Sequence, residues 1–195
     1  MEETKKQMVE FFDSQAKDWD RHSKPKAEAI NQLLNKLPLT EGRKVLDIAC
    51  GTGAITPYLY ERTKQPVKAI DRSSERVKKA EEKFRDDPRY SFCCEDFLLG
   101  NEEGYDFAVI FDAYPHFLDI KAFKKALLKA VKKNGYFAIL HDCSKEALAK
   151  HHAHILNLSR LLLPVEEEAK QFEDSFRILK TEEDGHHYLI LGQKI

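Results

Sequence analysis

The run Val45–Gly53, with the sequence VLDIACGTG, constrains the fold of this chain more than any other stretch. Its apolar residues predict a buried strand that stops where Gly51 and Gly53 permit positive φ and the close approach of a ligand. Further along, Val67–Asp71 predicts a second strand, whose terminal carboxylate suits the two hydroxyls of a ribose. A glycine turn and an acidic strand end in this order predict the mouth of a nucleotide-binding α/β unit.

Asp47 indicates which nucleotide this mouth would take. A dinucleotide brings a pyrophosphate, so its sites usually keep a third glycine, which is Thr56 here, and no acid beneath the phosphates. S-adenosylmethionine (SAM) carries a sulfonium and an ammonium, which a carboxylate complements. The residues therefore favour SAM, with a nicotinamide-dependent oxidoreductase as the alternative enzyme class.

The rest of the chain predicts alternating helices and strands followed by a hairpin. The continuous apolar run at 105–112 is typical of a strand buried on both faces of a parallel sheet. The predicted helices cover 54–64, 73–85, 119–133, 144–164 and 165–174, and the predicted strands cover 67–71, 90–97, 105–112, 136–140, 176–181 and 188–191.

The run VLDIACGTG resembles motif I of the class I SAM-dependent methyltransferases, with Ala49 in place of their usual first glycine. Alanine is compatible with this position if its φ is negative. The resemblance implies an α/β, Rossmann-like fold with a seven-stranded sheet of order 3-2-1-4-5-7-6, an antiparallel last strand and helices on both faces. We expect a single domain over 1–195, with the SAM-binding core at 43–195 and an N-terminal helical cap or lid at 1–42.

The N-terminal segment 11–20, FFDSQAKDWD, resembles the opening segment of methyltransferases related to the ubiquinone and menaquinone C-methyltransferases, a small-molecule group. In that group the segment covers the substrate side of the cofactor. Ordinary packing of an amphipathic helix would use the same aromatic residues, so both interpretations stay open.

The resemblance also implies roles for residues of the cofactor site. Asp47 is expected to bind the methionine ammonium and Asp71 the ribose hydroxyls. Asp96 and Phe97 are expected to contact the adenine, although a solvated aspartate at a strand end is the alternative for Asp96. The predicted site is completed by residues of the same turns and strand ends, namely Ala49, Cys50, Gly51, Gly53, Arg72 and Asp112.

Two histidines are predicted to be catalytic. Methyl transfer from a sulfonium is a displacement with a good leaving group already attached, so the protein mainly positions the reactants. His116 and His141 follow the fourth and fifth predicted strands, where either could deprotonate a phenol, a thiol or an activated carbon. Bonding of a loop histidine to the backbone is the alternative. The single Pro115 lies one residue late for the motif of amino-directed DNA methyltransferases, which disfavours nucleobase amines.

A histidine cluster raises the question of a metal. His151 and His154 lie three residues apart on a predicted helix and could chelate a transition metal together with His116 and His141. A packed or solvated cluster is the favoured interpretation, and no metal is predicted.

Composition excludes several other classes. The 32 basic and 33 acidic residues nearly cancel, giving a net charge of −1 and no argument for a nucleic-acid or anionic-membrane partner. The four cysteines have no CxxC spacing and are expected to be core thiols of a reduced, cytoplasmic protein. The charged segment 1–10 has no apolar core of a signal peptide.

We expect a cytoplasmic methyltransferase that uses SAM and a small-molecule acceptor; the alternatives are SAM binding without turnover and a protein or RNA methyltransferase. The acceptor, the methylated atom and the oligomeric state are left open.

Overall fold

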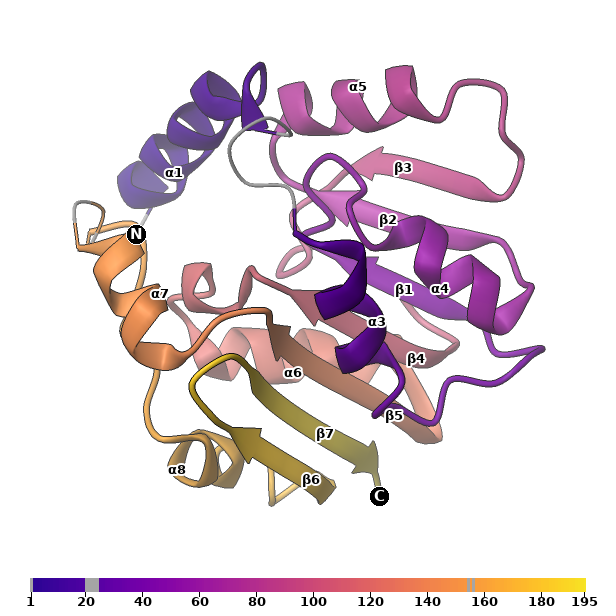
Figure 1. Cartoon of the computed structure of the whole chain (residues 1–195), viewed down its shortest axis with the longest axis vertical. Coiled ribbons are helices and arrows are strands. Elements are labelled where there is room, and N and C mark those ends of the chain that lie inside the picture. Colours follow the sequence, from indigo (N-terminus) through magenta and orange to yellow (C-terminus); the bar gives the residue numbers. More distant parts are fainter. Residues whose placement is uncertain (1, 20–24, 154, 156) are drawn as a thin grey trace.

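A seven-stranded sheet forms the centre of the computed structural model, which describes residues 2–19, 25–153, 155 and 157–195 (Figure 1). The strands are β1 (Val45–Ile48), β2 (Val67–Asp71), β3 (Tyr90–Cys94), β4 (Tyr105–Phe111), β5 (Val131–His141), β6 (Phe176–Glu183) and β7 (Tyr188–Lys194). Their order is β3-β2-β1-β4-β5-β7-β6, and β7 runs antiparallel to both of its neighbours. The predicted order and the reversed last strand are confirmed.

Helices cover both faces of the sheet, as expected. They are α1 (Glu2–Gln15), α3 (Ala27–Leu34), α4 (Thr56–Thr63), α5 (Ser74–Lys83), α6 (Ile120–Ala130), α7 (Lys145–His152), α8 (Val165–Lys170) and the 3-10 turn η1 (Tyr114–His116). Successive side chains of β4 point to opposite faces. Phe107 and Val109 join a core that includes Leu33 of α3, whereas Ala108 and Ile110 join the core beneath α6 (Figure 1). Both faces of the central strand are therefore buried.

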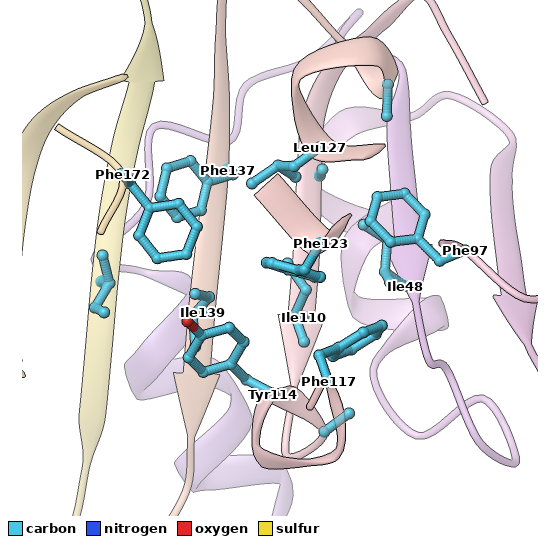
Figure 2. Packing of buried hydrophobic residues seen from close by; sticks show 14 of the residues in the cluster. Ile48, Phe97, Ile110, Tyr114, Phe117, Phe123, Leu127, Phe137, Ile139 and Phe172 are labelled. Atoms are coloured by element: carbon cyan, nitrogen blue, oxygen red, sulfur yellow. The ribbon is translucent and has the colours of Figure 1, made fainter. Parts of the chain in front are cut away.

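An aromatic cluster under α6 fixes the segment that follows β4. Phe123 of α6 lies 4.6 Å, between ring centroids, from Phe117 and 5.4 Å from Tyr114 (Figure 2). Tyr114 is fully buried, and its hydroxyl donates a hydrogen bond to the buried Glu168. Because Tyr114 within η1 and Phe117 directly after it are both packed in the core, the core sets the position of His116.

Helix α6 ends at Ala130, so the predicted helix end at 133 is wrong. Val131 adopts extended backbone angles and pairs with Tyr105 at the start of β5. The predicted stop at Asn134 lies inside the strand instead, where Asn134 has a φ of 61° and the register shifts. The β-branched Val131 gains more from burial in the sheet than from another helical turn.

The helix after Ser144 is also shorter than predicted. Ser144 caps α7 by accepting a hydrogen bond from the N–H of Ala147, but the helix ends at His152 and not near Pro164. Beyond it, the N–H of Arg160 donates to the carbonyl of Pro115. Leu158 and Leu162 are still buried, so their apolar spacing reflects burial in an irregular segment and not a helix.

The cysteines agree with the sequence only in part. All four are free, and Cys50 is buried, but Cys94 is exposed and Cys93 and Cys143 are half-buried. Cys94 lies on the edge strand β3, so the expectation of a core thiol is wrong for it, whereas Cys93 and Cys143 are partly buried against the core.

Helix α1 contacts two other parts of the chain, the segment after α7 and the start of α5. Met8 and Phe12 pack with Ile155 and Leu158. Asp13 accepts hydrogen bonds from the hydroxyl of Ser73 and from the backbone at the start of α5. The function of 1–42 as a lid stays a prediction. None of the helices in the described ranges is long and apolar enough to cross a membrane.

Candidate active site

A cleft opens at the carboxyl ends of β1, β2 and β4 and encloses about 940 Å³, its open mouth included. The predicted residues that line it are Asp47, Ala49, Cys50, Gly51, Asp71, Arg72, Phe97, Asp112 and His116. Gly53, Asp96 and His141 do not line it.

The turn after β1 has three residues in the left-handed region. Gly51 has a φ of 56° and Gly53 a φ of 78°, as the sequence predicts, and a Cβ on Gly53 would lie 2.9 Å from the ring of Phe84. Ala49 has a φ of 57°, so the expectation of a negative φ is wrong. Alanine is strained there, because its Cβ approaches the carbonyl oxygen. Burial raises the pKa of the Cys50 thiol well above its usual range.

Asp47 is a buried acid that faces the cleft. It is 1% exposed, and its Oδ2 accepts a hydrogen bond of 2.7 Å from the hydroxyl of Thr56. Burial raises the pKa of Asp47 to about 7, against the opposing effect of the Thr56 hydrogen bond. Within the described part of the chain no cation pairs with Asp47. A ligand ammonium fits this carboxylate, because it supplies the charge that the protein lacks here.

Asp71 holds the turn and faces the cleft. Its Oδ2 accepts from the N–H of Gly51 and its Oδ1 from the N–H of Ser73, both at 2.8 Å. Each carboxylate oxygen has two acceptor sites, so one on each is left for a ribose hydroxyl. Beside it, Nη1 of Arg72 lies 3.3 Å from the sulfur of Met8.

The two residues predicted to contact the adenine line different cavities. Phe97 is buried and lines the cleft, whereas Asp96 lies in an adjoining groove. There Asp96 accepts from the N–H of Leu98 and lies 3.5 Å from Nζ of Lys5. Its neighbour Glu95 lines the cleft instead. The adenine contact of Asp96 stays a prediction.

His116 lines the cleft just after β4. Its Nδ1 is 3.1 Å from the carbonyl oxygen of Leu158, so Nδ1 carries the proton and donates it. Its ring meets the ring of Phe12 edge-on, with centroids 4.8 Å apart. Burial lowers the pKa of His116 to about 3, although the Leu158 hydrogen bond opposes this. The imidazole is therefore neutral at physiological pH.

His141 lies behind the cleft wall. It is fully buried, its Nδ1 is 3.5 Å from Oδ1 of Asp112, and neither ring nitrogen has a hydrogen-bond partner among the described residues. Asp112 also accepts from the N–H of Asp142, and burial together with the charge of Asp112 raises the pKa of Asp142 to about 7. Asp112 lines the cleft, whereas His141 does not.

The structure describes only part of the histidine cluster. His154 lies outside the described residues, and His151 is exposed. In the described ranges the three-residue group with metal-ligand spacing is Glu182, Asp184 and His187, at the end of the β6–β7 hairpin, and it includes none of the four histidines considered above.

Sequence reasoning missed Arg76 in the first turn of α5. Its guanidinium lines the cleft and lies over the rings of Phe12 and Trp19, at 4.3 and 3.7 Å from their centroids. Ser73 caps the helix, and Arg76 is one of its three buried residues, with Val77 and Ala80.

The comparison with protein families decides the identity of the fold. A model described as a methyltransferase domain matches residues 39–189, most of the chain. The chain belongs to this methyltransferase family. Its cofactor is therefore SAM, and the nicotinamide-dependent alternative is set aside.

Individual relatives support the family at lower similarity. The chain is 27% identical to a malonyl-[acyl-carrier protein] O-methyltransferase of Acetivibrio thermocellus, over 69% of this chain and 48% of the relative. It is 32% identical to an uncharacterised methyltransferase of Schizosaccharomyces pombe, over 59% of this chain and 47% of the relative. The chain thus spans about half the length of these curated relatives. A SAM-dependent methyltransferase structure from Aquifex aeolicus has the same fold, with a TM-score of 0.72, 23% identity, and coverage of 94% of this chain and 98% of that one.

Proposed function

We propose that this chain transfers the methyl group of SAM to a small-molecule acceptor in the cytoplasm. The observation that carries the proposal is that one cleft joins a cofactor side to an acceptor side. Asp47 and Asp71 form the first, and His116 with Phe12 forms the second. An enzyme that aligns a nucleophile with a sulfonium methyl needs both sides in one cleft.

Each cofactor residue has a separate task in this proposal. Bound SAM supplies a methyl group already attached to a good leaving group. Asp47 binds the ammonium of its methionine part, and Asp71 binds the ribose while holding the backbone of Gly51 in place. The two acids fix the cofactor at both ends of the turn, so the sulfonium is directed toward the β4 side.

His116 orients the acceptor more than it deprotonates it. Because Nδ1 donates to Leu158, Nε2 is the acceptor atom of the ring. A pKa of about 3 makes this nitrogen a weak base but leaves it able to accept a hydrogen bond from a hydroxyl or thiol. His141 is a positioning residue that supports Asp112.

The acceptor is proposed to have an apolar body. Met8, Phe12 and Trp19 of the N-terminal segment line the cleft, together with Phe117 after β4. This wall supports the lid interpretation of 1–42. It also supports a place among the ubiquinone and menaquinone C-methyltransferase-like enzymes of small molecules.

Transfer of a labelled methyl group tests the proposal. The protein is incubated with deuteromethyl SAM and a metabolite extract, and label is followed by mass spectrometry in the small-molecule, protein and RNA fractions. We expect label in small molecules and its loss in Asp47→Ala. Label should be retained in Asp106→Ala, because Asp106 lies near the amino end of β4, whereas the cleft lies at the carboxyl end. Label confined to protein or RNA, or SAM binding without transfer, would contradict the proposal.

Once an acceptor is identified, His116→Asn separates the two roles of this histidine. Orientation predicts a KM raised about tenfold with little change in pH profile, whereas a general base predicts a kcat lowered by about 10²–10⁴ that recovers at high pH. The affinity for S-adenosylhomocysteine should be unchanged in either case.

A further inference from the structure

Arg76 is a buried cation whose hydrogen-bonding capacity is unused. The residue is 7% exposed and lines the cleft, yet its Nε and Nη2 are buried and have no hydrogen-bond partner among the described residues. A guanidinium has five N–H donors, and burying a charged donor without an acceptor is unfavourable. Such an arrangement is expected where a ligand supplies the missing acceptor.

Aromatic rings cover this guanidinium, but two of its nitrogens, Nε and Nη2, have no hydrogen-bond acceptor among the described residues. Phe12 and Trp19 lie against it as cation–π partners. No carboxylate in the described ranges lies within ion-pair distance of it. Asp71 and Asp13 attract it at longer range, but they already accept hydrogen bonds from the backbone at the glycine turn and at the start of α5.

The geometry of the unpaired atoms selects the chemistry of the ligand. Nε and Nη2 lie on the same edge of an arginine side chain, with nearly parallel N–H bonds. This edge is the one that binds a carboxylate through two hydrogen bonds. A neutral carbonyl would satisfy only one of them and would leave the charge unbalanced.

The position of Arg76 assigns this ligand to the acceptor side. The ring of Phe12 touches both Arg76 and His116, and the charge of Arg76 contributes to the low pKa of His116. We propose that Arg76 binds a carboxylate of the methyl acceptor, so that the enzyme selects acidic acceptors with an apolar or aromatic body. This inference rests on the proposed function and adds the acceptor's chemical class. The carboxylate of SAM has the same chemistry, so the test must separate the two sources.

Trp19 provides a direct readout, because it is the single tryptophan of the chain and lies against Arg76. Protein saturated with S-adenosylhomocysteine is titrated with benzoate and hexanoate, each compared with its neutral amide, while Trp19 emission is recorded. The variants are Arg76→Met, Arg76→Lys, which keeps the charge, and the matched control Arg62→Met, whose guanidinium bonds to Asn31 and Asn35 outside the cleft. Urea midpoints verify that each variant is folded.

We expect at least one carboxylate to bind tenfold or more tightly than its amide. Arg76→Met should lose this preference, Arg76→Lys should keep part of it, and Arg62→Met should keep all of it. Affinity for S-adenosylhomocysteine should change less than threefold in Arg76→Met.

Equal binding of acids and amides would overturn the inference. So would a tenfold loss of S-adenosylhomocysteine affinity in Arg76→Met that is absent for its decarboxylated analogue, because Arg76 would then serve the cofactor. Failure of the unmodified chain to bind S-adenosylhomocysteine would instead contradict the proposed function.

Discussion

The hydroxyl of Thr56 donates a hydrogen bond of 2.7 Å to Oδ2 of the buried Asp47. Thr56 occupies the position at which dinucleotide sites keep a third glycine, and here it supplies a donor to an acid. This bond lowers the pKa of Asp47, but burial raises it more strongly, to about 7. The charge of this carboxylate, which we propose binds the cofactor, therefore changes near neutral pH.

Cofactor affinity should consequently rise with pH. If only ionised Asp47 binds the ammonium, the binding-competent fraction rises about tenfold between pH 6 and 8 for a pKa of about 7. Calorimetric titration with S-adenosylhomocysteine should show this gain and proton release near pH 7. Thr56→Val should move the midpoint to higher pH, whereas Thr63→Val, which removes a buried hydroxyl bonded within α4, should not. An affinity independent of pH would contradict the assignment of Asp47.

The raised pKa of Asp47 makes the stability of the ligand-free fold decrease with pH, whereas it makes cofactor affinity increase with pH. The pKa of Asp47 is raised in the folded state, so its contribution to stability is present below the unfolded pKa of about 4 and is lost as pH rises to about 7. Asp47→Asn should remove this pH dependence. Urea unfolding of the ligand-free chain at pH 5 and 8 checks it, and a difference between the two proteins that does not change with pH would contradict it.

Asp71→Ala should weaken cofactor binding by about 1–3 kcal/mol, because hydrogen bonds to the ribose and to two backbone N–H groups are lost together. Asp106→Ala is the matched control, since Asp106 also accepts from a backbone N–H, that of Lys44, at the far edge of the sheet. Isothermal titration should show loss of affinity in the first variant alone. Equal affinities would remove Asp71 from the site.

The glycine turn gives a test of backbone strain. Gly53→Ala should lower the free energy of unfolding by about 1–3 kcal/mol, because φ is 78° and the new Cβ would lie 2.9 Å from Phe84. Ala49→Gly relieves strain but adds unfolded-state entropy, so its net change should be within about 1 kcal/mol. Gly185→Ala, with open space and no positive φ, should stay within about 0.5 kcal/mol. Chemical denaturation ranks the three, and a Gly53→Ala protein as stable as the original would contradict the turn geometry.

Glu168 should be critical for the segment that leads into α8. It is fully buried and accepts from Tyr114 and from the guanidinium of Arg160, at 2.9 and 2.8 Å for Oε1. Glu168→Ala leaves the arginine without its buried partner and should cost about 3–5 kcal/mol in urea unfolding. The exposed Glu167→Ala should cost less than about 0.5 kcal/mol. Similar losses in the two variants would show that the ion pair is not the cause.

The sequence predicts what depends on neighbours along the chain. The ends of β1 and β2 follow from apolar runs and glycines that act over a few residues, whereas the strand order followed only from the resemblance to the class I methyltransferases. The course of the chain after α7 and the burial of Arg76 do not, because they involve contacts with residues far away in sequence, Pro115 at Arg160 and Trp19 at Arg76. Arg76 is surrounded by charged residues in its own helix, which made it indistinguishable from a solvated side chain.

The two sides of the cleft are built from different kinds of chain segment. The side proposed to bind the cofactor comes from residues 47–71, in which Asp71 accepts a hydrogen bond from the N–H of Gly51 and Asp47 accepts one from Thr56. The side proposed to bind the acceptor is assembled from distant pieces, with Phe12 and Leu158 meeting at His116. Under the proposed function, substitutions in the N-terminal helix change which molecule is methylated while the methyl donor is kept, so new acceptor specificities would evolve or be engineered in that helix.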